Sequence, residues 1–327
     1  DGSLVALADK RGDHLGDLPN SISVVARRST DNGLTWGPMI TIAAADPSRG
    51  ITYGDPAVVV DPATGTIMAL FTGDQGFWTS TPDNPAHFYY SLSKDNGLTW
   101  SEPQSFTRQV MRPDWHGQFI ASGGAARLSD GRIMAVANVH RSQVPGRDTY
   151  EYAIWTDDLG RTWHVSDSTA TPAGNGNESK IYEKADGSLI MSIRARGNRL
   201  YSRSTDGGVT WSAAEPNLML PDPDCNGDIL LYPDSIGGRR VTLHSLPGSP
   251  RIRENATIYA SFDDGETWPV HRMLYNGLSA YTSMAVLPDG SIGVLVEEGK
   301  WDGNLPGEDG FNIAFYRFTP EWLLQGR

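Results

Sequence analysis

The residues that could carry chemistry in this chain are carboxylates, tyrosines and arginines rather than thiols or histidines. The 327 residues include a single cysteine, Cys225, which rules out an internal disulfide and a thiolate metal cage. The seven histidines are scattered without metal-ligand spacing, so no zinc site is expected. No calcium-binding loop is recognisable, and no cofactor is expected. Acid–base and ionic chemistry must therefore come from Asp, Glu, Tyr and Arg side chains.

The overall charge limits the class of partner. The formal net charge is −12 and the pI is near 5.0, with no basic stripe, so nucleic acid is not an expected partner. An anionic substrate would have to meet a local cluster of arginines inside an acidic protein. No apolar run approaches the roughly 18 residues that a membrane span needs. At 39% hydrophobic and 20% charged residues, the composition is typical of a globular protein.

A short pattern, Ser/Thr-x-Asp-x-Gly-x-Thr-Trp, occurs five times. The copies read STDNGLTW, SKDNGLTW, TDDLGRTW, STDGGVTW and SFDDGETW and start at residues 29, 93, 156, 204 and 261. Their spacings of 64, 63, 48 and 57 residues match a repeating unit of about four short strands. Half of the ten tryptophans lie in these turns.

The segments between the turns alternate with period two, as in SISVVARRS, GTIMALF, GRIMAVANV and GSLIMSIR. Turn signals such as SDGR, ADGS and PDGS separate them, which is typical of an all-β chain. A β-propeller of four-stranded antiparallel blades accounts for both the alternation and the repeat. At roughly 50 to 60 residues a blade, the chain predicts a six-bladed β-propeller that forms one domain over residues 1–327.

The repeated turn is best interpreted as architecture. Its Asp and Ser/Thr side chains can hydrogen-bond the turn backbone, its Gly takes a positive φ, and its Trp packs between strands. Five similar turns around a ring lie on one rim, whereas a single active site needs unlike residues that converge. Chemistry should therefore be sought between the repeats.

The turn resembles the Asp-box, or BNR repeat, of the sialidase (exo-α-sialidase, neuraminidase) superfamily, in its bacterial type. Asp-boxes also occur in non-catalytic propellers, but here the resemblance covers nearly the whole chain and includes more specific motifs. It implies a retaining glycoside hydrolase that removes terminal α-linked sialic acid through a tyrosine nucleophile. The carboxylate of such a sugar suits planar guanidinium partners, and it would repel an anionic nucleophile.

The resemblance assigns the catalytic pair and two arginines. In "SAYTSMAVLPDG" it implies Tyr281 as the nucleophile, and in "NGNESKIYEKADGSLIMSIRARG" it implies Glu178 as its partner base and Arg194 as a carboxylate ligand. In "RIRENATIYASFDDGETW" it implies Arg253 as a second carboxylate ligand, which spacing and strand parity favour over Arg251. Each of these residues alone could also be an ordinary strand or surface residue.

The resemblance also implies an acid and several pocket residues. In "ADKRGDHLGDLPNSISVV" the spacing from Arg11 favours Asp17 over Asp13 as the general acid, and Arg11 would lie beside the sugar's 4-position. Asp55 in "YGDPAVVVDPATG" would line the same region. Glu297 in "VLVEEG" matches the carboxylate that braces the family's first arginine.

Two tryptophans, Trp78 in "QGFWTS" and Trp115 in "PDWHGQF", either contact sugar or pack within blades. Aromatic faces suit the apolar faces of sugars, and they equally suit the inside of a blade. Both residues therefore stay outside the predicted site.

The chain departs from the family pattern at its start. The family's first arginine lies in a Phe/Tyr-Arg-Ile-Pro motif about ten residues before the "DGSL" turn, and this chain starts at that turn with Asp1. We therefore expect a first strand missing from an incomplete chain. A swapped segment or a degenerate site is the alternative. Without that strand, "FNIAFYRFTPEWL" would keep an unpaired edge.

Three functions stay open at this point. The first is an exo-sialidase acting on sialylated glycans, expected to be a monomer that is secreted, at the cell surface or periplasmic. The second is a related hydrolase for another ulosonic acid such as Kdn or Kdo, or a trans-sialidase. The third is a non-catalytic Asp-box propeller that binds glycan or protein. The third predicts that Tyr281, Glu178 and Asp17 do not converge.

Overall fold

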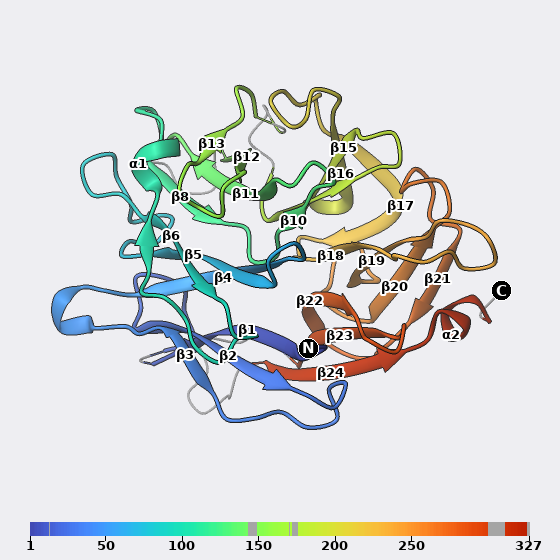
Figure 1. Ribbon diagram of the computed structural model, residues 1–327. Helices are drawn as coiled ribbons and strands as arrows, with labels where there is room; N and C mark the ends of the chain where they lie inside the picture. The colour runs from blue at the N-terminus through green and yellow to red at the C-terminus, as the bar shows by residue number, and fades with distance from the viewer. Residues whose placement is uncertain (13, 143–148, 170, 172–175, 300–310, 326–327) are drawn as a thin grey trace.

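The computed structural model describes residues 1–12, 14–142, 149–169, 171, 176–299 and 311–325. Six antiparallel sheets follow one another around a ring, and the last, drawn in red, lies beside the first, drawn in blue (Figure 1). The predicted all-β, six-bladed propeller is confirmed. We number the sheets as blades 1 to 6 in chain order.

The blades have the following strands. Blade 1 has β1 (Leu4–Arg11), β2 (Ile22–Ser29) and β3 (Ile40–Ala43). Blade 2 has β4 (Tyr53–Asp61), β5 (Thr66–Gly73), β6 (His87–Ser93) and β7 (Gln104–Ser105), and β9 (Gly123–Gly124) joins β4 in parallel. Blade 3 has β8 (Gly117–Ile120), β10 (Ala126–Arg127), β11 (Ile133–His140), β12 (Thr149–Thr156) and β13 (His164–Val165). Blade 4 has β14 (Ser179–Glu183), β15 (Leu189–Ile193), β16 (Arg196–Ser204) and β17 (Glu215–Pro223). Blade 5 has β18 (Asp228–Leu231), β19 (Thr242–Pro247), β20 (Ala256–Ser261) and β21 (Val270–Met273). Blade 6 has β22 (Ser279–Val286), β23 (Ile292–Glu298) and β24 (Asn312–Phe318).

Blades 1 and 6 each have three strands among the described residues. In blades 2 to 5 the Asp-box directly follows the third strand, as it does after β6, β12, β16 and β20. By the same rule β2 is a third strand, so β1 occupies the place of a second strand. Among the residues described, blade 1 therefore has no first (inner) strand and blade 6 has no fourth (outer) strand. The outer edge of β24 is unpaired within these residues.

Each Asp-box is a self-contained turn. In the second copy, the Ser93 hydroxyl accepts the Gly97 N–H at 2.8 Å and donates to Asp95 at 2.9 Å. Asp95 also accepts the backbone N–H and the hydroxyl of Thr99, at 2.9 and 2.5 Å. The indole N–H of Trp100 donates to the Gly97 carbonyl. These bonds satisfy the turn with its own residues, as expected for an architectural repeat.

The glycine of each box also meets the preceding blade. A Cβ at Gly97 would lie 3.0 Å from Val5 of blade 1, and one at Gly265 would lie 2.2 Å from the Tyr182 hydroxyl of blade 4. The other three boxes show the same relation, pairing Gly33 with Phe315, Gly160 with Tyr90 and Gly208 with Met134. Glycine is required here both for its positive φ, +82° at Gly97, and for this close approach. The five turns thus join neighbouring blades.

The apolar core lies between the blades. Separate clusters of buried side chains fill the spaces from blade 1 to blade 2 and onward to blade 6. Between blades 6 and 1, Phe315 meets Trp36 edge-on with ring centroids 5.5 Å apart.

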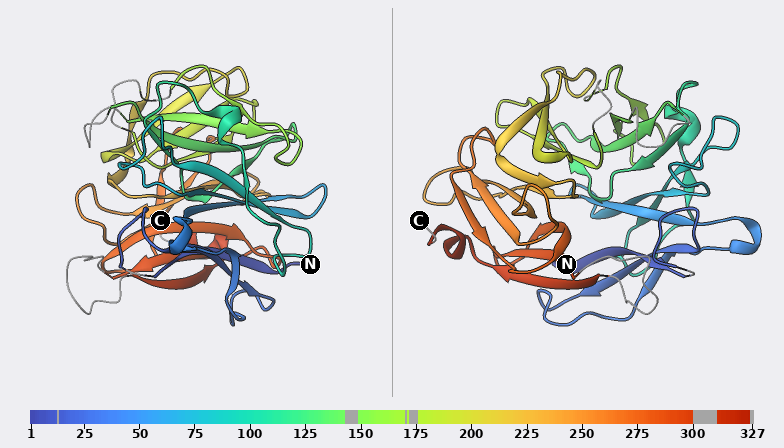
Figure 2. Two further views of the ribbon diagram at one scale, coloured as in Figure 1. Left: turned by 90° about the vertical axis from the view of Figure 1, so that its left-hand side faces the viewer. Right: turned by 180° about the vertical axis from the view of Figure 1, so that it is seen from behind.

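The helical segments are short and lie outside the sheets. They are η1 (Pro47–Arg49), α1 (Thr107–Val110) and α2 (Pro320–Leu324), and the rear view in Figure 2 shows α2 at the outer edge of the ring. No helix among the residues described is long and apolar enough to cross a bilayer.

Candidate active site

The predicted site residues gather at the end of the ring opposite the Asp-boxes. Neighbouring strands of a blade are antiparallel, so the start of the first strand, the finish of the second and the start of the third lie at the same end of the blade. The Asp-box follows the third strand and therefore lies at the opposite end. The site residues occupy those three kinds of position: Asp55 in β4, Glu178 before β14, Tyr281 in β22, Arg11 ending β1, Arg194 after β15, Glu297 in β23 and Arg253 before β20. Different blades therefore supply them to one face.

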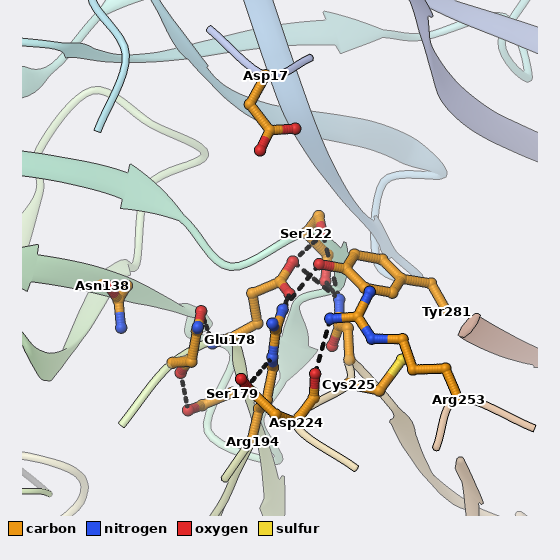
Figure 3. Close-up of polar contacts among 12 residues, drawn as sticks. Asp17, Ser122, Asn138, Glu178, Ser179, Arg194, Asp224, Cys225, Arg253 and Tyr281 are labelled. Carbon is orange, nitrogen blue, oxygen red and sulfur yellow. Dashed lines mark hydrogen bonds and ion pairs between the residues drawn. The ribbon is translucent and has the colours of Figure 1, made fainter. Parts of the chain in front are cut away.

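Arg194 joins the predicted nucleophile to the predicted base. Its Nη1 donates to the Tyr281 hydroxyl at 2.8 Å and to Glu178 Oε2 at 2.5 Å (Figure 3). Its Nε donates to Asp224 Oδ1 at 2.7 Å. The guanidinium is mostly buried, and so is Glu178, which is 2% exposed. The three side chains are held in one fixed cluster.

The protonation states suit a tyrosine nucleophile. Burial raises the pKa of Tyr281 well above its usual value, and the Glu178 carboxylate raises it further. Burial also tends to raise the pKa of Glu178, but Arg194, Lys180 and hydrogen bonds outweigh it, so this pKa is lowered. At neutral pH the tyrosine is a phenol beside an ionised carboxylate that can accept its proton.

Arg253 also lies beside Tyr281. Its guanidinium carbon is 5.7 Å from the centre of the Tyr281 ring, and that of Arg194 is 5.9 Å from it. Arg253 Nη2 donates to the Asp224 carbonyl at 2.7 Å, so one residue orients both arginines. Arg251, the disfavoured alternative, is exposed. Two guanidiniums beside the phenol form a site for an anion.

Asp17, the predicted general acid, pairs with Arg11 at 2.9 Å. Its side chain is 76% exposed. Figure 3 shows Asp17 apart from the contact between Tyr281 and Glu178, with its carboxylate directed toward that side. Asp13 lies outside the described residues. The structure therefore brings Asp17 beside Arg11 but not into contact with Tyr281 or Glu178.

Asp55 interacts with the charge of Glu178 and with those of the residues around Arg11 and Asp17. It has a left-handed backbone with φ 56°, and its N–H donates to Asp9 Oδ1 at 3.2 Å. Burial raises its pKa well above the usual value, and the charges of Asp9, Glu178 and Asp17 add to this shift. Asp55 is thus within electrostatic range of both the predicted base and the predicted acid.

Glu297 contacts the nucleophile's backbone. Its Oε2 accepts the Tyr281 N–H at 3.1 Å. Burial raises its pKa to about 7, and the Glu178 carboxylate contributes, while Arg11 and Arg253 oppose the shift. The bracing of a first arginine stays a prediction. Within the described ranges, no three His, Cys, Asp or Glu side chains are placed to hold a metal ion.

Sequence reasoning missed several residues that support the site. Asp9 pairs with Arg11 at 3.2 Å, and period two in a strand could have found it, because residues two apart share a face. Asp224, Ser122 and Asn226 contact the site from loops, where no sequence signal marked them.

The two tryptophans differ in their surroundings. Trp115 is fully buried against Tyr152, so it is a packing residue. Trp78 is 44% exposed and stacks on His140, with ring centroids 5.0 Å apart.

Comparisons with known proteins indicate the family of this chain. The family model described as "BNR repeat-like domain" matches residues 17–294. The chain is 33% identical over 340 aligned residues to a sialidase of Micromonospora viridifaciens, covering 99% of this chain and 50% of that protein. It is 28% identical to a sialidase of Bacteroides fragilis (strain YCH46), covering 90% of this chain and 58% of that protein. The chain thus spans about half the length of these relatives.

Solved structures give the same result for the fold. The Hadza microbial sialidase Hz136 superposes with a TM-score of 0.86 and 27% identity, covering 98% of this chain and 64% of that one. A likeness of that extent includes every blade described above.

Proposed function

The chain belongs to the sialidase superfamily, and we propose that it is an exo-sialidase that hydrolyses terminal α-linked sialic acids with retention at the anomeric carbon. One observation carries this proposal: Arg194 binds the Tyr281 phenol and the Glu178 carboxylate together, between blades 4 and 6. That arrangement gives a neutral nucleophile with an adjacent base, which suits a substrate that is itself an anion.

In the first step Glu178 takes the phenolic proton while the Tyr281 oxygen forms a bond to the anomeric carbon. The glycosidic C–O bond breaks, and protonated Asp17 gives its proton to the leaving oxygen. The product is a glycosyl–tyrosine intermediate plus the free aglycone alcohol. Arg194 and Arg253 hold the substrate carboxylate throughout, because bidentate guanidinium contacts fix both its position and its plane.

In the second step the Asp17 carboxylate takes a proton from water, and the resulting hydroxide equivalent attacks the anomeric carbon. The bond to the Tyr281 oxygen breaks, and Glu178 returns its proton to the phenolate. Two displacements on one carbon give net retention. Asp17 is exposed and paired with Arg11 before substrate arrives.

The test is release of a fluorescent aglycone from an aryl α-sialoside by the unmodified chain and by Tyr281→Phe. We expect Tyr281→Phe to lose about 10³-fold or more in kcat, because the covalent step has no nucleophile. Tyr90→Phe is the matched control. Its hydroxyl only bonds Gln104 at 2.8 Å in blade 2, so its rate should match the unmodified chain.

A mass measurement tests the covalent step separately. A 2,3-difluorinated sialic acid should add one sugar mass to the unmodified chain, and peptide mapping should place it on Tyr281. Near-normal turnover by Tyr281→Phe, or label on another residue, would refute the assigned role. No turnover and no label would favour a binding propeller. Transfer of the sugar to an acceptor alcohol, in place of hydrolysis, would indicate a trans-sialidase.

A further inference from the structure

In addition to Arg194, a second set of side chains forms hydrogen bonds with the Glu178 carboxylate. The Ser122 hydroxyl donates to Glu178 Oε1 at 2.6 Å, and the Asn226 side-chain N–H donates to the same oxygen at 3.2 Å. Arg194 binds the other oxygen. Figure 3 shows Ser122 on the far side of Glu178 from Arg194. Glu178 Oε1 is thus fixed by Ser122 and Asn226, while Arg194 holds Oε2.

A buried lysine determines how these groups are oriented. Lys180 is 2% exposed, and its Nζ donates to Asn226 Oδ1 at 2.9 Å and to the Ser122 carbonyl. An ammonium group can only donate, so the Asn226 oxygen must face Lys180. The Asn226 nitrogen must then face Ser122 and Glu178, where it donates to the Ser122 carbonyl at 2.9 Å and to the Glu178 carboxylate.

The backbone beside Ser122 is shaped around the lysine. Gly123 has φ +108°, and a Cβ there would lie 2.9 Å from Lys180 Cε. A Cβ at Gly124 would lie 3.5 Å from Asp228 Oδ1. Both the positive φ and the close approach require glycine at 123. The "SGG" segment at 122–124 therefore approaches the ring axis closely enough to contact Lys180.

We propose that Lys180, acting through Asn226 and Ser122, is a positioning residue that keeps the Glu178 carboxylate ionised and aimed at Tyr281. This inference rests on the proposed function, since it gives Glu178 the role of base. The hydrogen bonds of Lys180 go to Asn226 and to the Ser122 carbonyl, and these two residues hold Glu178. The charge of Lys180 also helps to lower the pKa of Glu178.

The electrostatic surroundings show why a second cation is needed. Several charged or titratable groups act on Glu178 or are shifted by it: Arg194, Lys180, Tyr281, Asp55 and Glu297. The two carboxyl groups among them oppose its ionisation. Arg194 must also bind the substrate carboxylate, which reduces its support for Glu178 during the reaction. Lys180 lies outside that contact, so its charge stays available to Glu178 through every step.

A purely structural role for Lys180 is the alternative. Asp228 is 5% exposed, accepts the N–H groups of Met284 and Ile229, and lies near enough to raise the pKa of Lys180 against the effect of burial. Lys180 could therefore serve only to neutralise Asp228. Lys180→Met alone would leave that buried carboxylate unpaired and could fail to fold. The double variant Lys180→Met/Asp228→Asn removes both charges and separates the two roles.

The first experiment does not depend on turnover. Proteins labelled with ¹³C at the glutamate carboxyls are titrated by NMR, with the Glu178 signal assigned from Glu178→Gln. In the double variant we expect the pKa of Glu178 to rise by about one to three units, because one nearby cation is gone. Asp228→Asn alone keeps the cation and should leave the Glu178 pKa low. Lys184→Met is a matched control, since Lys184 pairs with Glu266 outside the site.

The second experiment is the pH profile of sialoside hydrolysis. The acid limb of kcat/KM should move to higher pH in the double variant, and kcat near pH 6 should fall about 10- to 100-fold with KM little changed. Ser122→Ala removes one bond to Glu178 without touching Lys180, so a smaller shift in the same direction is expected. These changes report on Glu178 rather than on folding.

The outcomes distinguish this inference from the proposed function. An unmoved Glu178 pKa in both the double variant and Ser122→Ala would overturn the inference, whatever the turnover. A raised Glu178 pKa in a chain that shows no hydrolysis would support the positioning role and count against the proposed function alone. If the double variant has the same kinetics as the unmodified chain, Lys180 serves only to neutralise Asp228. That outcome would also overturn the inference.

Discussion

Two carboxyl groups at the site end of the propeller, Asp55 and Glu297, have pKa values shifted in the opposite direction from those of the Asp-box carboxylates. At the Asp-box end, hydrogen bonds from the box threonine lower the pKa values of Asp31, Asp95 and Asp206 to about 2, although these groups lie near water. At the site end, burial raises the pKa of Glu297 to about 7 and that of Asp55 well above its usual value. The same chemical group is held ionised at one end and pushed toward neutrality at the other.

The difference lies in where the partners come from. The aspartate at the third position of each Asp-box has its hydrogen-bond partners within four residues along the chain, as Asp95 has in Ser93 and Thr99. The partners of Glu178 come from four blades, at Ser122, Arg194, Asn226 and Tyr281. Local bonds can be repeated in every blade because they need no neighbour. A converging site can be built once, and burial then alters its pKa values.

The largest expected effect is a loss of activity on replacing Arg194, with Arg203 of the same blade as the control. Arg194→Lys removes the forked contacts to Glu178, Tyr281 and Asp224, so sialoside hydrolysis should fall about 10³-fold or more. Arg203→Lys changes a 45% exposed residue that pairs with Glu266 near the Asp-box end, and its kcat/KM should stay within about twofold. The measurement is kcat/KM for both variants beside the unmodified chain. Equal losses would mean that the two ends are not functionally distinct.

The second effect is a pH dependence at the site end. The pKa of Glu297 in the folded protein, about 7, is above the usual glutamate value of 4.5, so its contribution to stability is full below pH 4.5 and is lost as pH rises through 7. Glu297→Gln removes this term and can still accept the Tyr281 N–H. The variant should therefore gain on the order of 3 kcal/mol in unfolding free energy relative to the unmodified chain between pH 4.5 and 8.

Urea unfolding at several pH values measures that difference. Glu298→Gln, one residue along the same strand, is the control for an added amide. A constant difference between Glu297→Gln and the unmodified chain across this range would show that the buried carboxyl is not being ionised at a cost. The pH dependence would then belong to another group.

The third expected effect is a loss of folding stability without a change in catalytic rate. Ser204 is 2% exposed, and its hydroxyl accepts the Gly208 N–H at 2.8 Å. Ser204→Ala leaves that buried N–H unpaired, which should cost about 1–3 kcal/mol of unfolding free energy. The kcat of the folded variant should not change. Ser48→Ala, at an exposed serine, is the control and should not change the unfolding free energy in the same urea experiment. A drop in kcat for Ser204→Ala would mean that the Asp-box end influences catalysis at the site end.

The smallest effect is the pH dependence of one Asp-box. The pKa of Asp206 in the folded protein, about 2, is below the usual aspartate value of 3.8, so its stabilising contribution is present above pH 3.8 and disappears as pH falls toward 2. Asp206→Asn should be slightly less stable than the unmodified chain at neutral pH, with the gap closing in acid. A gap that widens in acid would contradict the assignment of these hydrogen bonds. Its direction is opposite to that expected for Glu297→Gln.

Much of the fold was predictable because its signals are local. Period-two alternation and the repeated turn indicate strands and blades without reference to distant residues. The family motifs also pointed to Tyr281, Glu178, Arg194 and Arg253, which lie together at one end of the ring, while their catalytic and binding roles stay predictions. The acid role of Asp17 stays a prediction, since its observed contact is with Arg11.

The sequence by itself determined the β-propeller, the number of its blades and the position of its repeated turns, because hydrogen bonds within a few residues specify each of them. Only the tertiary structure decided which loops reach the axis. Asp224, Ser122 and Asn226 come from segments without a repeat or a periodic pattern, yet they orient both arginines and the base. The pKa values at the site were likewise decided there, because they depend on burial and on charges brought together from different blades.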